Sequence, residues 1–127
     1  MAIETSPLVL IVDDDPDGRE MYATTMKMAG FRVEQAADGF EAVDKAYKLH
    51  PGVILMDLLM PRLDGWEVVG WLQRNATTRS IPIVAVTGAS EEQRLKAKAE
   101  GCERVLVKPC LPDQLLAEVR SVLAGQP

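Results

Sequence analysis

The sequence contains little of what small metal-binding or secreted domains depend on. It has one histidine and two cysteines, Cys102 and Cys110, among 127 residues. Two cysteines are too few for a disulfide framework, so we expect two reduced thiols in a cytoplasmic protein. No histidine is near either cysteine in the sequence, which leaves a zinc site without its usual ligands.

Long apolar runs and an excess of basic residues are also absent. No run approaches the ~20 apolar residues that cross a bilayer. The N-terminus, MAIETSPLVLIVDDD, has neither the basic region nor the long apolar stretch of a secretory signal. Acids outnumber bases 19 to 14, for a net charge of -5. Since a nucleic-acid-binding surface needs a basic patch, we expect neither direct nucleic-acid binding nor insertion into a membrane.

The sequence instead alternates between two periodicities. Short runs rich in Val, Ile and Leu have the length of buried strands, and the segment Phe31–Ala36 predicts a more exposed strand near an edge. Helical patterns lie between the strands, and several begin with a capping residue, such as Asp15 before Pro16. The apolar runs are Leu8–Val12, Val53–Met56, Ile81–Val86 and Val105–Val107; the other helix starts are Asp38, Asp64, Ser90 and Pro112.

The spacing of apolar residues also predicts which helix positions face the core. In the first helix the expected buried stripe includes Met21, Tyr22 and Met26, and in the second it includes Phe40 and Tyr47. The fifth helix has the clearest stripe, with Leu115, Leu116, Val119, Val122 and Leu123. Five strands alternating with five helices predict a parallel sheet covered on both faces, because parallel strands need crossover connections. We predict one domain over residues 1–127, with a core of about 7–124 and no effector domain.

Polar residues occur where four of the predicted strands end. Asp13 and Asp14 follow the first strand, Asp57 the third, Thr87 the fourth and Lys108 the fifth. Parallel α/β sheets bind ligands beyond these strand ends, so the side chains should meet at one edge. Clustered carboxylates favour a hard cation such as Mg²⁺. A carboxylate can also act as a nucleophile toward phosphorus, with a lysine and a metal neutralising the transferred group.

Four motifs at these strand ends make the sequence similar to a known family. They are LVLIVDDDPDGR, VILMDLLMPRLDGWEV, IPIVAVTGA and RVLVKP, and they span nearly the whole chain. The sequence resembles the receiver domains of two-component response regulators, in particular the single-domain chemotaxis regulator. The resemblance implies a flavodoxin-like, doubly wound (βα)5 fold with five parallel strands in the order 2-1-3-4-5. It also implies a signalling switch that catalyses only its own phosphorylation and dephosphorylation.

The resemblance assigns the acceptor and the metal ligands. Asp57 is the expected phospho-acceptor, which takes a phosphoryl group from a histidine kinase or a histidine phosphotransfer protein. Asp13 and Asp14 form the acidic pair that holds Mg²⁺, or Mn²⁺ in its place, together with Asp57. The main-chain carbonyl of Leu59 completes the set of protein ligands. Asp15 is excluded from that set, because its position before a proline makes it a helix cap.

The resemblance also assigns the switch. Thr87 is the expected switch hydroxyl, Lys108 contacts the phosphoryl group, and the bond from Lys108 to Pro109 is expected to be cis. A downstream protein is expected to bind the face formed by the fourth helix, fifth strand and fifth helix. One residue departs from the family pattern, because Val105 occupies a position that is commonly aromatic.

Three other functions compete with a free-standing receiver. A pseudo-receiver would bind partners without phosphate, although the set of five polar residues is complete. The chain could also be a receiver cut from a larger hybrid kinase or regulator. A metal-dependent phosphatase with an aspartate nucleophile would need a substrate pocket, for which 127 residues with short connections leave no room.

Overall fold

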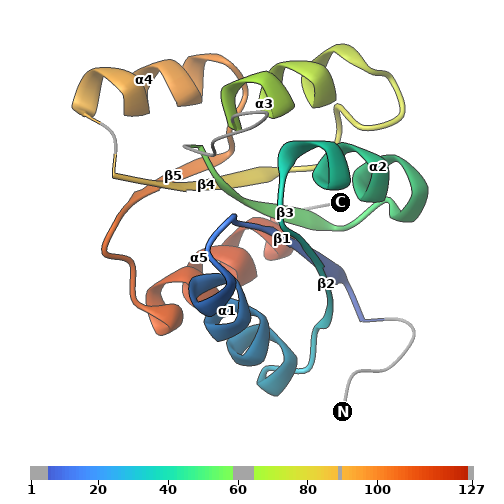
Figure 1. Cartoon of the computed structure of the whole chain (residues 1–127), viewed down its shortest axis with the longest axis vertical. Coiled ribbons are helices and arrows are strands. Elements are labelled where there is room, and N and C mark those ends of the chain that lie inside the picture. Colours follow the sequence, from blue (N-terminus) through green and yellow to red (C-terminus); the bar gives the residue numbers. More distant parts are fainter. Residues whose placement is uncertain (1–5, 59–64, 89, 126–127) are drawn as a thin grey trace.

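A five-stranded parallel sheet forms the centre of the molecule, in a computed structural model that describes residues 6–58, 65–88 and 90–125 (Figure 1). The strand order is β2-β1-β3-β4-β5, which confirms the predicted fold class. The five strands are β1 (Leu8–Val12), β2 (Arg32–Ala36), β3 (Val53–Asp57), β4 (Ile83–Thr87) and β5 (Arg104–Val107).

The burial of each strand follows its sequence. Every residue of β3 and β4 is buried, as expected for apolar strands covered on both faces. The edge strand β2 is mostly half-buried, as its alternating pattern predicted. β4 begins at Ile83, not at Ile81 as predicted, because Pro82 has no N–H to donate to a neighbouring strand. Its carbonyl still accepts a hydrogen bond from the N–H of Ile54, at 3.0 Å.

Helices cover both faces of the sheet. α1 and α5 lie on one face, and α2, α3 and α4 lie on the other (Figure 1). Three predicted caps are present, because Asp15, Asp38 and Ser90 each accept hydrogen bonds from N–H groups of the following turn. The predicted start of α3 at Asp64 lies outside the described residues. The helices are α1 (Pro16–Met28), α2 (Gly39–Leu49), α3 (Gly65–Arg74), α4 (Glu91–Ala99) and α5 (Pro112–Ala124).

Some apolar helix residues that the spacing placed in the core are exposed. The exposed fractions of Met21, Phe40 and Tyr47 are 46%, 67% and 56%. The reason is visible in α2, whose buried residues are all small, including Ala42 and Ala46. Small side chains let the helix lie close to the sheet, so larger side chains at the margins of the stripe remain outside. Among the described helices, none is long and apolar enough to cross a membrane.

Gly65 fixes the position of α3 beside the end of β3. Its N–H donates a hydrogen bond to the carbonyl of Leu58 at 2.9 Å. A Cβ atom at this position would lie 2.4 Å from Leu58 Cα and 2.7 Å from the carbonyl oxygen of Asp57. Both contacts are with backbone, which cannot move aside without displacing the strand end. Only glycine therefore allows α3 to begin this close to Asp57.

Replacing Gly65 with alanine should destabilise the protein by about 1–3 kcal/mol, the usual effect of overpacking. The matched control is Gly70→Ala in the same helix, where the nearest obstacle is the flexible Arg74 side chain, 3.0 Å away. In a helix interior, alanine is more favourable than glycine by about 1 kcal/mol. The control variant should therefore be as stable as the parent or more stable. Urea denaturation measures both changes. Equal urea midpoints for Gly65→Ala and Gly70→Ala would show that the strand end leaves room for a side chain at position 65.

Candidate functional site

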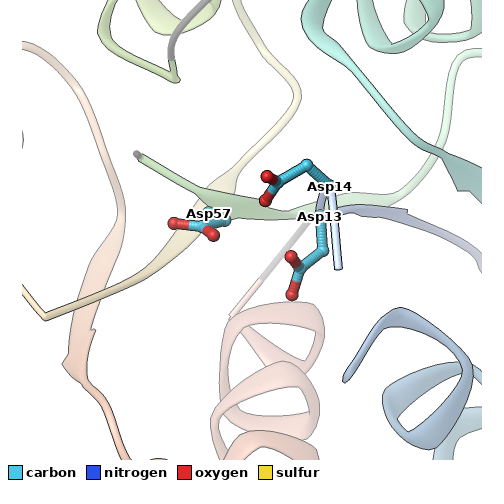
Figure 2. Close-up of side chains that lie close together, drawn as sticks. All are labelled: Asp13, Asp14 and Asp57. Carbon is cyan, nitrogen blue, oxygen red and sulfur yellow. The ribbon is translucent and has the colours of Figure 1, made fainter. Parts of the chain in front are cut away.

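Three carboxylates lie together where β1 and β3 end (Figure 2). Val12 and Met56 are paired in the parallel register, so Asp13 and Asp57, the residues that follow them, come side by side. One oxygen from each of Asp13, Asp14 and Asp57 lies within 4.8 Å of the others. Asp13 and Asp57 are buried and Asp14 is exposed, so the cluster has an open side.

Lys108 reaches the cluster from the end of β5, the edge strand that lies two positions from β3 in the sheet. Its Nζ lies 3.1 Å from Oδ2 of Asp57, and the two groups form an ion pair. The side chain of Asp57 is 8% exposed. The N–H of Lys108 donates to the carbonyl of Thr87 at 2.9 Å, which anchors the start of the loop after β5. The Lys108–Pro109 peptide bond is cis, as the resemblance implied.

The pKa values of two site residues reflect this crowding of charges. Burial is the main cause of a raised pKa at Asp13, and the charges of Asp57 and Asp14 raise it further, against the N–H of Asp15 and the charge of Lys108. Partial burial by itself lowers the pKa of Lys108, but the hydrogen bond and the charges of Asp57 and Asp13 raise it on balance. Lys108 is thus placed to relieve part of the repulsion among three carboxylates whose oxygens lie within 4.8 Å of one another.

Thr87 ends β4, between the strands that carry Asp57 and Lys108. In the parallel register Asp57 pairs with Val86, and Thr87 pairs with Val107. Thr87 is fully buried, and Gly88 and the Ser90 cap of α4 follow it closely in the chain. Thr87 is therefore only three positions before the residue that caps α4.

The structure brings together every predicted site residue that it describes. Asp13, Asp14, Asp57 and Lys108 form one cluster, and Thr87 lies at the same edge of the sheet. Leu59, the predicted main-chain ligand, lies outside the described residues. Asp15 caps α1, accepting from the N–H groups of Asp17 and Gly18, which confirms the predicted helix cap.

Two supporting residues were missed in the sequence. Nη1 of Arg19 donates to the carbonyl of Asp13 at 2.8 Å and so holds the strand end that carries the acidic pair. The hydroxyl of Tyr22 donates to the carbonyl of Cys110 at 2.9 Å, which ties α1 to the loop after Lys108. Arg19 ends the DDDPDGR motif, so its position was a usable signal. The Tyr22 contact joins residues 88 positions apart, and no local pattern indicates it.

The two cysteines are buried and take no part in the cluster. Cys102 packs in the core on the side of α2, α3 and α4, and Cys110 packs on the side of α1 and α5. Burial raises the pKa of the Cys102 thiol to about 11, and it also raises the pKa of Cys110. Both thiols are consequently less acidic than an exposed cysteine and favour the protonated form at neutral pH.

The donor set of the cluster fits a hard divalent cation. The ligand atoms are carboxylate oxygens, and Mg²⁺ in proteins is usually held by one or two carboxylates with waters and phosphate oxygens. The exposed side at Asp14 leaves space for those other ligands. A cation there would also reduce the repulsion that Lys108 relieves only in part.

Comparison with known proteins places this site in a family. The model of the response regulator receiver domain matches residues 9–120. PilH of Pseudomonas aeruginosa is 37% identical over 120 residues, covering 92% of this chain and 98% of PilH. The transcriptional regulator RpaA of Synechocystis is 35% identical over 118 residues, but these are 92% of this chain and 49% of RpaA. The chain thus spans about half the length of several curated relatives that it matches.

Solved structures give the same result. The chemotaxis response regulator CheY4 of Vibrio cholerae superposes with a TM-score of 0.87 at 39% identity, covering 93% of this chain and 99% of CheY4. The receiver domain of sensor histidine kinase PA1611 from Pseudomonas aeruginosa gives a TM-score of 0.86 at 25% identity, covering 95% and 100% of the two chains. That structure has a magnesium ion coordinated in its active-site cleft. With the acidic cluster and the strand order, these matches show that the chain belongs to the receiver domains of two-component response regulators.

Proposed function

We propose that this chain is a phosphorylation-dependent switch that accepts a phosphoryl group on Asp57. The donor is a phosphohistidine of a histidine kinase or a histidine phosphotransfer protein, and the reaction uses Mg²⁺, for which Mn²⁺ can substitute. The observation that carries the proposal is the position of Asp57, which is 7% exposed, paired with Lys108 at 3.1 Å, and clustered with Asp13 and Asp14 within 4.8 Å. The buried free thiols fit a reducing, cytoplasmic location.

The chemistry requires little of the protein except positioning and charge. A carboxylate oxygen of Asp57 attacks phosphorus, the P–N bond to the donor histidine breaks, and its electron pair returns to the imidazole nitrogen, which takes up a proton. An acyl phosphate remains on Asp57. Lys108 is placed to stabilise negative charge on the transferred group. Asp13, Asp14 and Asp57 would hold the cation, with the carbonyl of Leu59 as a proposed further ligand. A cation held there would supply positive charge against the phosphoryl oxygens.

The output of the switch is a change in α4 and the face beside it. Phosphorylation replaces one negative charge with nearly two and adds acceptor oxygens, which should draw the Thr87 hydroxyl toward Asp57. Of the α4 residues only Ala97 is buried, so this helix can shift at low cost. Two exposed apolar side chains on this face offer a surface to a downstream protein; they are Leu95 of α4 and Val107 at the end of β5, with exposed fractions of 65% and 42%.

The first test is phosphorylation itself. Incubation with acetyl phosphate and Mg²⁺ should add the mass of one phosphoryl group to the parent, measured by intact mass spectrometry. Asp57→Asn should gain none, since its amide is not a nucleophile. The matched control is Asp113→Asn, an exposed acid in the first turn of α5, which should gain the group like the parent. Equal phosphorylation of Asp57→Asn would show that the acceptor is another residue.

The second test concerns the metal. Mg²⁺ at ~100 times its dissociation constant should stabilise the folded protein by about 2.7 kcal/mol, because it binds only the native cluster. The melting temperature should rise accordingly, and Asp14→Asn should remove most of the rise. Asp15→Asn is the control, because asparagine caps a helix as well as aspartate and the charge change is the same. The assignment of the metal site is wrong if Asp14→Asn and Asp15→Asn both retain the full rise in melting temperature.

The third test follows the switch. Beryllofluoride, a phosphoryl mimic, should shift the backbone amide resonances of Gly88 and Ser90–Glu100 more than that of Val105. Val105 is half-buried against the core beneath α4, and as a β-branched residue it has few rotamers to exchange. Large shifts of the Val105 resonance, with the resonances of α4 unchanged, would contradict the proposal that the signal passes from Thr87 to α4.

A further inference from the structure

A groove of about 750 Å³ lies between α2, α3 and α4, apart from the acidic cluster. Its lining includes both tryptophans of the chain and one of its two phenylalanines. Trp66 and Trp71 are half-buried, and Phe40 projects beside them with 67% of its surface exposed. The chain has few aromatic residues, and this groove concentrates half of them at one solvent-facing position.

α3 and α4, two of the helices that line the groove, run in the same direction (Figure 1). Near the start of α3, Nζ of Lys96 lies 4.9 Å from the ring centroid of Trp66. At the other end, Nε2 of Gln73 donates to the carbonyl of Gly101 at 3.5 Å. These two contacts align the beginning of α3 with the middle of α4, and the end of α3 with the residues just after α4.

Four charged residues of the lining occupy the corners of this surface. On α3, Glu67 lies near the start and Arg74 at the end; on α4, Lys96 lies opposite the start and Glu100 opposite the end. The signs therefore alternate around the groove, and the rim is locally neutral on a chain with a net charge of -5. A pattern of this kind offers no preference for an anionic or a cationic ligand.

The same pattern is complementary to itself. If a second copy faces the groove with its helices antiparallel, Glu67 meets Arg74 of the second copy, and Lys96 meets Glu100 of the second copy. The two-fold rotation repeats each pair, as in every isologous interface. Antiparallel helices also place the positive end of each helix dipole beside the negative end of its neighbour.

Gly70 lies midway between Glu67 and Arg74 on α3, where the two-fold axis would cross the helix. It lines the groove, and a Cβ there would meet only the movable Arg74 side chain. Glycine in a helix interior costs about 1 kcal/mol relative to alanine, and one compensation is close approach of another backbone. For the two Gly70 residues to face each other in the antiparallel arrangement, the Arg74 side chain that lies over each of them would swing outward, toward Glu67 of the second copy.

We propose that the groove between α2, α3 and α4 is a self-association surface, on which a second copy of this chain packs with α3 and α4 antiparallel. The aromatic rings form the dry centre of the interface, and the four charged corners form its polar rim. This division into an aromatic core and a charged rim is the usual composition of a specific interface.

Charge exchange on α4 tests the proposal. Sedimentation equilibrium at about 0.15 M salt, where the net charges of two copies are screened, should show a concentration-dependent monomer–dimer equilibrium in the parent. Lys96→Glu and Glu100→Lys should each raise the dissociation constant about tenfold or more, because each places like charges opposite one another in both symmetry-related pairs. The double variant Lys96→Glu/Glu100→Lys should restore association, since it re-forms the pairs with their signs exchanged.

The matched control is Lys98→Glu, an exposed residue of the same helix that lines a different hollow, with Leu95 and Arg104. It makes the same charge change and should leave the dissociation constant unaltered. All three positions of substitution, Lys96, Lys98 and Glu100, are solvent-exposed, so melting curves should match the parent closely. The proposal is wrong if the parent stays monomeric at about 0.5 mM. It is also wrong if Lys98→Glu raises the dissociation constant as much as the single variants do, or if the double variant does not regain the dissociation constant of the parent.

Discussion

The mutual repulsion of three carboxylates at the end of β1 and β3 is the constraint on which the rest of the molecule depends. The parallel register brings Asp13 and Asp57 together, and Lys108 forms an ion pair with Asp57. Every nearby feature serves to hold the cluster in place despite its charge. Arg19 donates a hydrogen bond to the carbonyl of Asp13 at the end of β1, and Gly65 allows α3 to begin against the end of β3. The backbone N–H of Lys108 is hydrogen-bonded to β4, which positions the lysine. A site held under such repulsion is sensitive to any cation or phosphoryl group that changes the local charge.

The sequence predicted the sheet and the cluster well because both depend on short-range signals. Apolar runs define strands, and in a parallel α/β sheet the residue that ends each run is necessarily at one edge. The burial of helix side chains was predicted less well. Phe40 and Tyr47 of α2 have the spacing of core residues, yet only small residues such as Ala42 are buried beneath this helix, so it lies close to the sheet and the larger side chains remain outside. The Tyr22–Cys110 contact lay beyond prediction because it depends on the folded arrangement of α1 and the β5–α5 loop.

α4 has a special position because it contributes to two surfaces at once. Leu95 and Lys98 face the hollow toward β5 and α5, whereas Lys96 and Glu100 line the groove toward α3. The helix is attached to the sheet mainly through Ala97, and its first residue follows closely after Thr87. Under the two proposals made above, one movement of this helix would alter the surface for a downstream protein and the surface for a second copy together. Phosphorylation and self-association would then be thermodynamically linked, each changing the other's equilibrium by the same factor.

The burial of Cys102 and Cys110 has a practical consequence for studying such movements. With a thiol pKa of about 11, Cys102 is a reactive thiolate in roughly one molecule in a few thousand near pH 7.5. Cys110 is also buried and its pKa is likewise raised, so we expect both thiols to react more slowly with an alkylating dye than an exposed cysteine does. A cysteine introduced at an exposed position of α4 could therefore be labelled selectively in the otherwise unaltered chain. The native packing of both thiols makes the protein suitable for site-directed spin or fluorescence labelling without prior removal of its own cysteines.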